Sequence, residues 1–141
     1  MSGPPVNLVC GNLTPRQRLA ELFDIIILIS DANQLRIPTS PQFTAFEWLV
    51  NRDPAQVCPE DVLDVRQRYI AAVLYFSTNG DNWLVCNEPN APNLSPCSTQ
   101  RYLSAADVCN WFGSDCNNAG ELNRLIVGKK IIGARTVKVM R

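Results

Sequence analysis

The residues of this chain with the most distinctive chemistry are its six cysteines, at positions 10, 58, 86, 97, 109 and 116. Cysteine thiols bind zinc or form disulfides, but the chain has no C-x-x-C pair and no histidine, so a zinc site would need an unusual spacing. We therefore predict three disulfides. Proximity in the sequence favours Cys109–Cys116 and Cys86–Cys97, which leaves Cys10–Cys58 for the third.

Acidic residues offer the other candidate chemistry. Glu60, Asp61 and Asp64 could act in pairs as general acid and base, but Asp61 and Asp64 stand where acids favour the start of a helix. Asn79–Asn82 has oxygen ligands for calcium but lacks the terminal glutamate and the spacing of an EF-hand loop, which favours a turn. Without histidine, the commonest general base is missing. We expect no catalytic residues, no metal, no cofactor and no enzymatic activity.

The predicted disulfides imply an extracellular or luminal compartment. The first twelve residues contain no basic residue and one short apolar piece, so no signal peptide is recognised. Either the numbering starts at a mature or engineered end, which we favour, or the cysteines are reduced in an organelle, in association with a membrane complex, or in the cytosol. Asn12-Leu13-Thr14 and Asn93-Leu94-Ser95 are glycosylation sequons. Because Pro96 follows the second, Asn12 is the candidate for a glycan.

The composition favours a globular protein with one core. Of the 141 residues, 46% are apolar and 18% are charged, and 13 basic residues balance 13 acidic ones. A formal net charge of zero gives no general attraction to nucleic acid, which is not an expected partner. It also gives little colloidal repulsion, which suits a protein within an assembly.

Two helices are predicted from a hydroxyl residue followed by proline. Thr14-Pro15 starts one that runs to about Ile29, and Ser40-Pro41 starts one that stops before Asp53-Pro54. The aliphatic end of the first helix is interrupted by charges too often to span a bilayer. We expect a core helix; docking on a partner protein or a membrane surface is the alternative. Its predicted apolar face consists of Leu19, Leu22, Phe23, Ile26 and Ile27.

A third helix is predicted from a cap at Asp61 to Thr78-Asn79-Gly80, where the glycine is expected to take the left-handed conformation. Residues 81–103 contain four asparagines and three prolines without periodicity, which predicts a long loop tied down by its two cysteines. One helical turn is expected within 105–111. The tail, 134–141, is expected to form a short edge strand whose basic residues discourage further pairing.

The stretch 69–116 resembles the N-terminal cap of plant and algal leucine-rich repeat proteins. In that family a helix of the type A-L-x-x-L-Y-x-x-T-x-G leads into G-D-x-W, a cysteine-flanked W-x-G-V-x-C and a first repeat. The matching positions here are Ala72, Leu74, Tyr75, Thr78, Gly80, Asp81, Trp83, Cys109, Trp111, Gly113, Cys116, Leu122, Leu125, Val127 and Ile132. Residues 40–49 and 67–69 look most like the diatom versions, and the resemblance covers roughly 38–133.

The resemblance implies structural roles for Trp83, Trp111, Gly80 and Gly113, with both tryptophans lying across the apolar end of a repeat solenoid. The chain departs from the family pattern, because Lys129-Lys130 stands where the ladder asparagine is expected and no second repeat follows. About three repeats are needed for a stable solenoid. The resemblance therefore implies a cap with one degenerate repeat, whose uncovered edge is a docking surface.

We predict a mainly α fold with a small β element: three helices, then a disulfide-stapled leucine-rich-repeat cap with one degenerate repeat. The expected divisions are an N-terminal extension with one amphipathic helix (1–37), a helical, disulfide-rich cap (38–120), and a repeat strand with a basic tail (121–141). The expected function is non-enzymatic binding of other proteins, outside the cell or in the secretory lumen. The alternative is a small accessory subunit in a large assembly, such as an organellar membrane or photosynthetic complex. The expected contact surfaces are the 81–103 loop and the edge that holds Leu122, Leu125, Val127, Lys129, Lys130 and Ile132.

Overall fold

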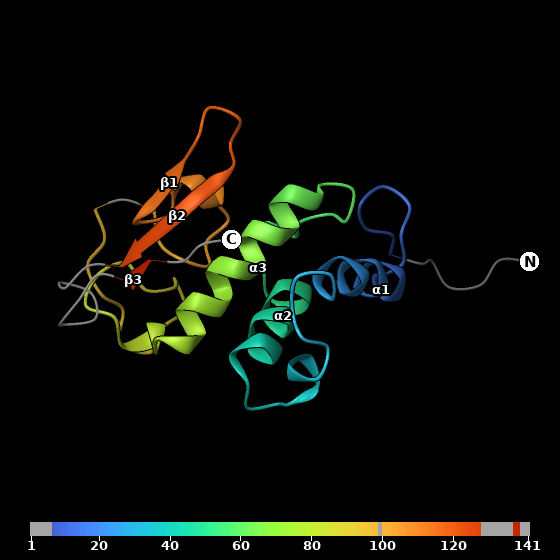
Figure 1. Cartoon of the computed structure of the whole chain (residues 1–141), viewed down its shortest axis with the longest axis horizontal. Coiled ribbons are helices and arrows are strands. Elements are labelled where there is room, and N and C mark those ends of the chain that lie inside the picture. The colour runs from blue at the N-terminus through green and yellow to red at the C-terminus, as the bar shows by residue number, and fades with distance from the viewer. Residues whose placement is uncertain (1–6, 99, 128–136, 139–141) are drawn as a thin grey trace, which may run out of the picture.

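The computed structural model describes residues 7–98, 100–127 and 137–138. Its regular elements are α1 (Pro15–Ile26), α2 (Pro41–Asn51), α3 (Val62–Ser77), β1 (Ser114–Cys116), β2 (Leu122–Val127) and β3 (Val137–Lys138). Three short 3-10 turns join them: η1 (Gln34–Arg36), η2 (Gly80–Asn82) and η3 (Val108–Asn110). α3 runs through the middle, with α1 and α2 on one side and the sheet on the other (Figure 1). The predicted mainly helical fold with three helices and a small β element is confirmed.

The predicted starts of α1 and α2 are confirmed in their hydrogen bonds. The Thr14 hydroxyl accepts from the Gln17 N–H at 3.1 Å, and the Gln17 side chain accepts from the Thr14 N–H at 2.8 Å. The Ser40 hydroxyl accepts from the Phe43 N–H at 2.9 Å. Caps of this kind stabilise a helix by about 1 kcal/mol. Asp61 is the N-cap residue of α3, as predicted, but its side chain makes no capping hydrogen bond.

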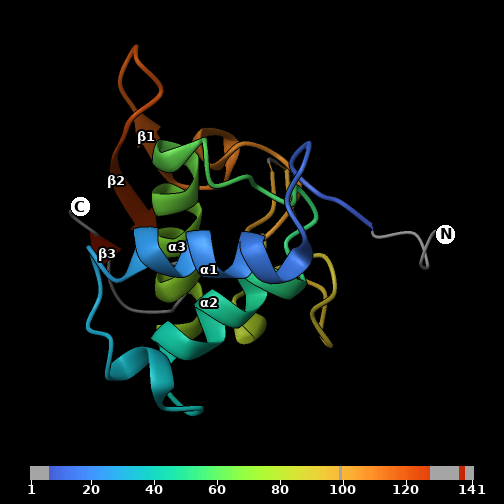
Figure 2. The same cartoon turned by 90° about the vertical axis from the view of Figure 1, so that its right-hand side faces the viewer.

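The first helix ends earlier than predicted, whereas the third ends at the predicted place, with Thr78 as its C-cap. α1 ends at Ile26, and residues 27–29 form turns whose side chains point outward. The buried face of α1 therefore holds Arg18, Leu22 and Ile26, whereas Leu19 and Ile27 are exposed. Figure 2 shows α1 crossing α3, a geometry in which one narrow face of α1 meets its neighbours.

The left-handed residue after α3 is Asn79, with φ of 58°, and not Gly80. Asparagine tolerates this conformation because its short polar side chain can bond locally. Gly80 is required for another reason: a Cβ atom there would overlap the ring of Tyr75. The glycine thus permits the chain to turn back closely against α3.

The core contains both tryptophans of the family pattern. Trp83 and Trp111 are buried against Tyr102, with ring centroids 4.7 Å and 5.3 Å from it. Trp111 also meets Trp48 of α2 edge to face, at 6.4 Å. The expectation that these indoles lie across an open solenoid end is therefore wrong, because the aromatic residues of this same domain cover them.

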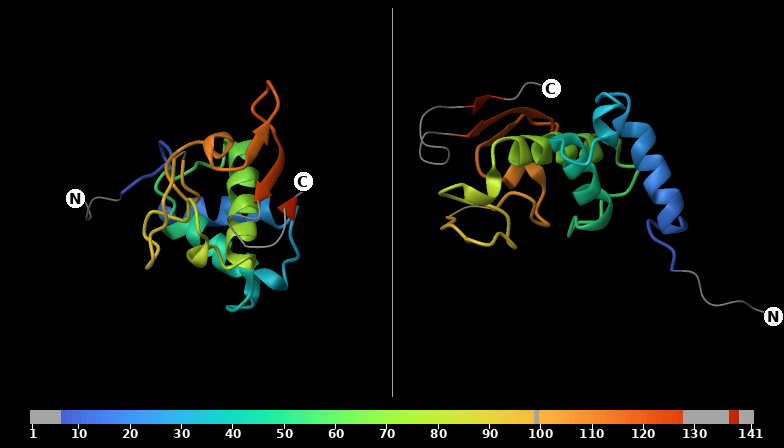
Figure 3. Two further views of the ribbon diagram at one scale, coloured as in Figure 1. Left: turned by 90° about the vertical axis from the view of Figure 1, so that its left-hand side faces the viewer. Right: turned by 90° about the horizontal axis from the view of Figure 1, so that it is seen from below.

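The cysteines pair as predicted, as Cys10–Cys58, Cys86–Cys97 and Cys109–Cys116. The second bridge closes the loop 81–103, which lies on the opposite side of α3 from the sheet (Figure 3). The helical turn expected within 105–111 is η3.

The sheet is antiparallel in the order β1-β2-β3. Ser114 pairs with Leu125, and Val127 pairs with Val137. β3 falls within the predicted tail strand. No leucine-rich repeat fold is visible among the described residues, and the predicted division into three segments stays a prediction.

Candidate functional site

Arg68 and Asp53 form a buried ion pair within the core. Arg68 Nε donates to Asp53 Oδ2 at 3.0 Å, and its Nη atoms donate to the carbonyls of Ala106 and Ser104 at 2.9 Å and 2.7 Å. The guanidinium lies 5.5 Å from the ring centre of Trp48 and 5.1 Å from that of Trp111. Sealed between two indoles, this pair joins α2, α3 and the segment before η3, which is a structural role.

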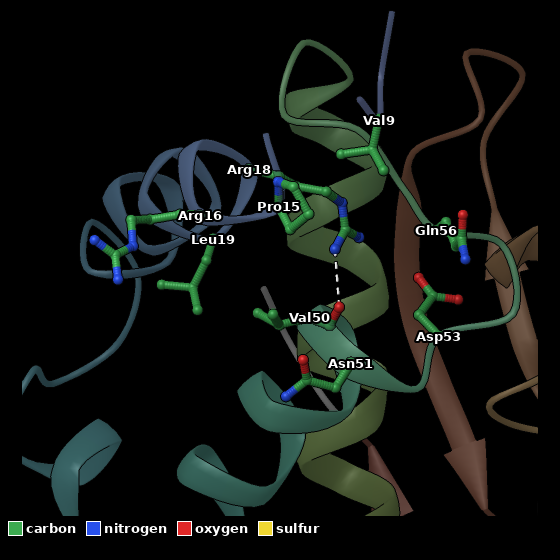
Figure 4. Close-up of a pocket in the computed structure, with 9 residues that line it drawn as sticks. All are labelled: Val9, Pro15, Arg16, Arg18, Leu19, Val50, Asn51, Asp53 and Gln56. Atoms are coloured by element: carbon green, nitrogen blue, oxygen red, sulfur yellow. Dashed lines mark hydrogen bonds between the residues drawn. The ribbon is translucent and has the colours of Figure 1, made fainter. Parts of the chain in front are cut away.

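A cavity of about 350 Å³ lies between α1 and the end of α2 (Figure 4). Arg18 reaches across it and donates to the carbonyls of Val50 and Val57, each at 2.9 Å. The guanidinium thereby satisfies the Val50 carbonyl, which the end of α2 leaves without a partner, and a carbonyl of the loop that follows α2. Burial lowers the pKa of Arg18, and the nearby charge of Asp53 opposes that change. Since Arg18 and Asp53 are both engaged within the protein, we assign this cavity a structural role.

The residues predicted as structural are engaged in internal contacts. Trp83 Nε1 donates to the Thr78 hydroxyl at 3.2 Å, and Trp111 Nε1 donates to the Ala106 carbonyl at 2.9 Å. Gly113 has φ of 82°, a left-handed conformation that favours glycine. These residues build the fold around α3.

The residues predicted to form an interaction surface are not exposed where the structure describes their side chains. Leu122 and Leu125 are 8% and 0% exposed, so their side chains belong to the core, which does not fit the predicted contact surface. The backbone of Val127 pairs with β3, so the β2 edge is covered there. The predicted contact residues Lys129, Lys130 and Ile132 lie outside the described residues.

An exposed aliphatic segment follows α1 instead. Ile27, Leu28 and Ile29 form what we term the apolar turn, with exposures of 38%, 74% and 41%. The sequence signal was the unbroken run from Ile25 to Ile29, for which partner docking was the alternative to a core helix. The early end of α1 leaves the last three of these side chains at the surface.

A groove of about 270 Å³ adjoins the apolar turn and continues along α3. Ile29, Ile70 and Val73 supply apolar walls. The hydroxyls of Ser30 and Tyr69 bond each other at 2.7 Å, and burial raises the pKa of Tyr69, which keeps the phenol neutral. Gln42 lines the same groove, and its buried Oε1 has no hydrogen-bond partner within the described residues. We term this region the α1–α3 groove, after the turn that follows α1 and the helix α3 that line it.

Comparisons with known proteins returned no match: no family model fits the chain, and no curated protein or solved structure resembles it significantly. In the described segments, no helix combines the length and the apolar character needed to cross a bilayer. The three disulfides suggest an extracellular or secretory environment.

Proposed function

We propose that this protein acts without catalysis, by binding a partner protein through the apolar turn and the α1–α3 groove. The observation that carries the proposal is the exposure of three consecutive aliphatic side chains beside a preformed groove. Contiguous apolar surface rimmed by polar groups is typical of protein interaction sites. Full burial of each such side chain contributes about 1.5–3 kcal/mol, which is enough for a small patch to stabilise a complex.

The groove favours a peptide segment as its occupant. Its walls, which include Ile29, Ile70 and Val73, suit an aliphatic side chain, and the hydroxyls of Ser30 and Tyr69 beside them can hydrogen-bond a peptide group. A partner protein that inserts one aliphatic side chain of a peptide segment fits both features.

As the class of protein we propose a cap of the leucine-rich-repeat type, located outside the cell or in the secretory lumen. The support is the order of the motif residues along the chain and the disulfide Cys109–Cys116, which flanks Trp111. A permanently docked accessory subunit of a large assembly is the second candidate, because the same apolar turn would then stay covered.

The test compares two exposed leucines, which are 74% and 59% exposed. Leu28 belongs to the apolar turn, and Leu94, 59% exposed in the 81–103 loop, is the matched control. The native size of tagged chains is measured by size-exclusion chromatography of an extract of the source tissue. We expect wild type and Leu94→Glu to elute as a complex, and Leu28→Glu and Val73→Glu to elute as the free chain.

If wild type elutes as a free 15.7 kDa chain, the binding proposal is wrong. Elution of wild type with one large complex under all conditions would favour the accessory subunit. A smaller complex that dissociates on dilution would favour a binding module.

A further inference from the structure

A separate cavity of about 520 Å³ lies between the end of α2 and the 81–103 loop. This volume falls within the range of small-molecule sites. Pro54, Pro92 and Leu103 line it with apolar surface, while Asp81, Glu88 and Arg52 bring charges of both signs. None of these residues belongs to the α1–α3 groove, so this cavity is independent of the proposed function.

The acidic side of the cavity is held in place by Tyr75. Its hydroxyl donates to Asp81 Oδ1 at 2.7 Å and accepts from the Glu88 N–H at 3.0 Å. Glu88 is 9% exposed. Within the described residues, no N–H or O–H group of the protein donates to its carboxyl, and the Asp81 carboxyl is its neighbour. The Glu88 carboxyl is nine-tenths buried, faces the cavity and has no N–H or O–H donor from the protein. A donor group on a ligand would supply the missing hydrogen bond.

The basic side is Arg52, at the end of α2. Its Nε and Nη2 atoms both face Glu47 Oε1, at 3.1 Å and 2.9 Å. The Nη1 atom makes no bond within the described residues. One edge of the guanidinium is bonded to Glu47, and its other edge can donate hydrogen bonds to the carboxylate of a ligand.

We propose that this cavity binds a small zwitterion, with its ammonium group on Glu88 and Asp81 and its carboxylate on Arg52. An ammonium carries three donors and a positive charge, so it can donate to both carboxylates and offset their negative charge. The apolar residues leave room for an aliphatic body, so an α-amino acid with an aliphatic side chain is the simplest member of the class.

The test is isothermal titration with three matched probes: leucine, 3-methylbutylamine, which lacks the carboxylate, and 4-methylpentanoate, which lacks the ammonium. We expect leucine to bind best, the amine to bind more weakly, and the acid not to bind. Glu88→Gln should weaken leucine binding about 10–100-fold, as loss of a charge-assisted hydrogen bond does. Arg52→Gln should reduce leucine to the level of the amine. Glu21→Gln, an exposed carboxylate outside the cavity, is the control and should change nothing.

A second readout needs no variant. Burial, followed by the charge of Asp81 and a hydrogen bond with it, raises the pKa of Glu88 to about 7, while Arg52 opposes the change. Binding of leucine at about pH 6 should therefore release a proton, seen as a dependence of the titration heat on the buffer, and this should vanish near about pH 8.5. Failure of all three probes to bind at about 10 mM would overturn the proposal. So would binding of 4-methylpentanoate as tight as leucine, or unchanged affinity in Glu88→Gln when its circular dichroism matches wild type.

Discussion

Arg68 and Asp53 form an ion pair whose side chains are 1% and 0% exposed, between the rings of Trp48 and Trp111. The two lie 15 positions apart in the sequence, and the pair holds α3 against the segment after α2. A charge taken this far from water is tolerable only while its partner is present. Removing either partner is therefore expected to lower the free energy of unfolding strongly.

We predict that Arg68→Met destabilises the protein by about 3–5 kcal/mol, because it leaves the Asp53 carboxylate buried without its partner. Arg124→Met is the matched control, since Arg124 and Asp115 form an exposed pair, and its cost should stay below about 1 kcal/mol. Urea unfolding gives both values. Equal losses from the two substitutions would contradict the structural role assigned to the buried pair.

The disulfides should contribute unequally. Cys10–Cys58 spans 48 residues and Cys109–Cys116 spans 7. The chain-entropy argument predicts that replacing both cysteines by serine costs about 4 kcal/mol for the long bridge and about 2 kcal/mol for the short one. Denaturant midpoints of the two double variants test the order. A larger loss from the short bridge would show that contacts other than loop closure determine its contribution.

Position 79 should tolerate glycine better than alanine. At φ of 58°, Asn79→Ala should cost about 1–2 kcal/mol, whereas Asn79→Gly should cost little. Thermal unfolding measures the difference. If alanine and glycine behave alike at this position, the left-handed end of α3 is wrong.

Glu88 should make stability depend on pH. Its pKa, raised to about 7 in the folded chain, exceeds that of an exposed glutamate, so the folded state binds the proton more tightly than the unfolded state. The cost of burying the carboxylate is fully present above about pH 7 and disappears as the pH falls below about 4.5. We expect this group to raise stability as the pH is lowered from about 8 to about 5. The contribution should be absent from Glu88→Gln, and equal slopes in the two proteins would contradict it.

Much of the fold could be predicted from local signals. A threonine or serine followed by proline correctly predicted where two helices start, and the spacing of the cysteines correctly predicted all three disulfides. The helix starts and two of the disulfides depend on residues that are close in the sequence. The third disulfide followed because only two cysteines were left to pair. The turn at Asn79 shows the limit, since the clash with the Tyr75 ring that makes Gly80 necessary exists only after the chain has turned back.

The candidate sites could not be predicted because they depend on distant residues. Nothing in the sequence marks Arg18 as a buried residue, yet its guanidinium donates to the carbonyl of Val57, which lies 39 positions away. Glu88 and Asp81 become a pair only because Tyr75 contacts both. No helix-breaking residue in the sequence marks the end of α1 at Ile26, which leaves Leu28 exposed.

The most direct measurement of the binding proposal is site-specific photo-crosslinking from the apolar turn. A benzophenone amino acid replaces Leu28 in one variant and Leu94 in another, and both are irradiated in an extract of the source tissue. We predict one discrete adduct from position 28, mapped to an aliphatic-containing peptide of a single partner and lost when Val73→Glu is added, and none from position 94. Absence of an adduct at position 28, or the same adducts from both positions, would contradict the account.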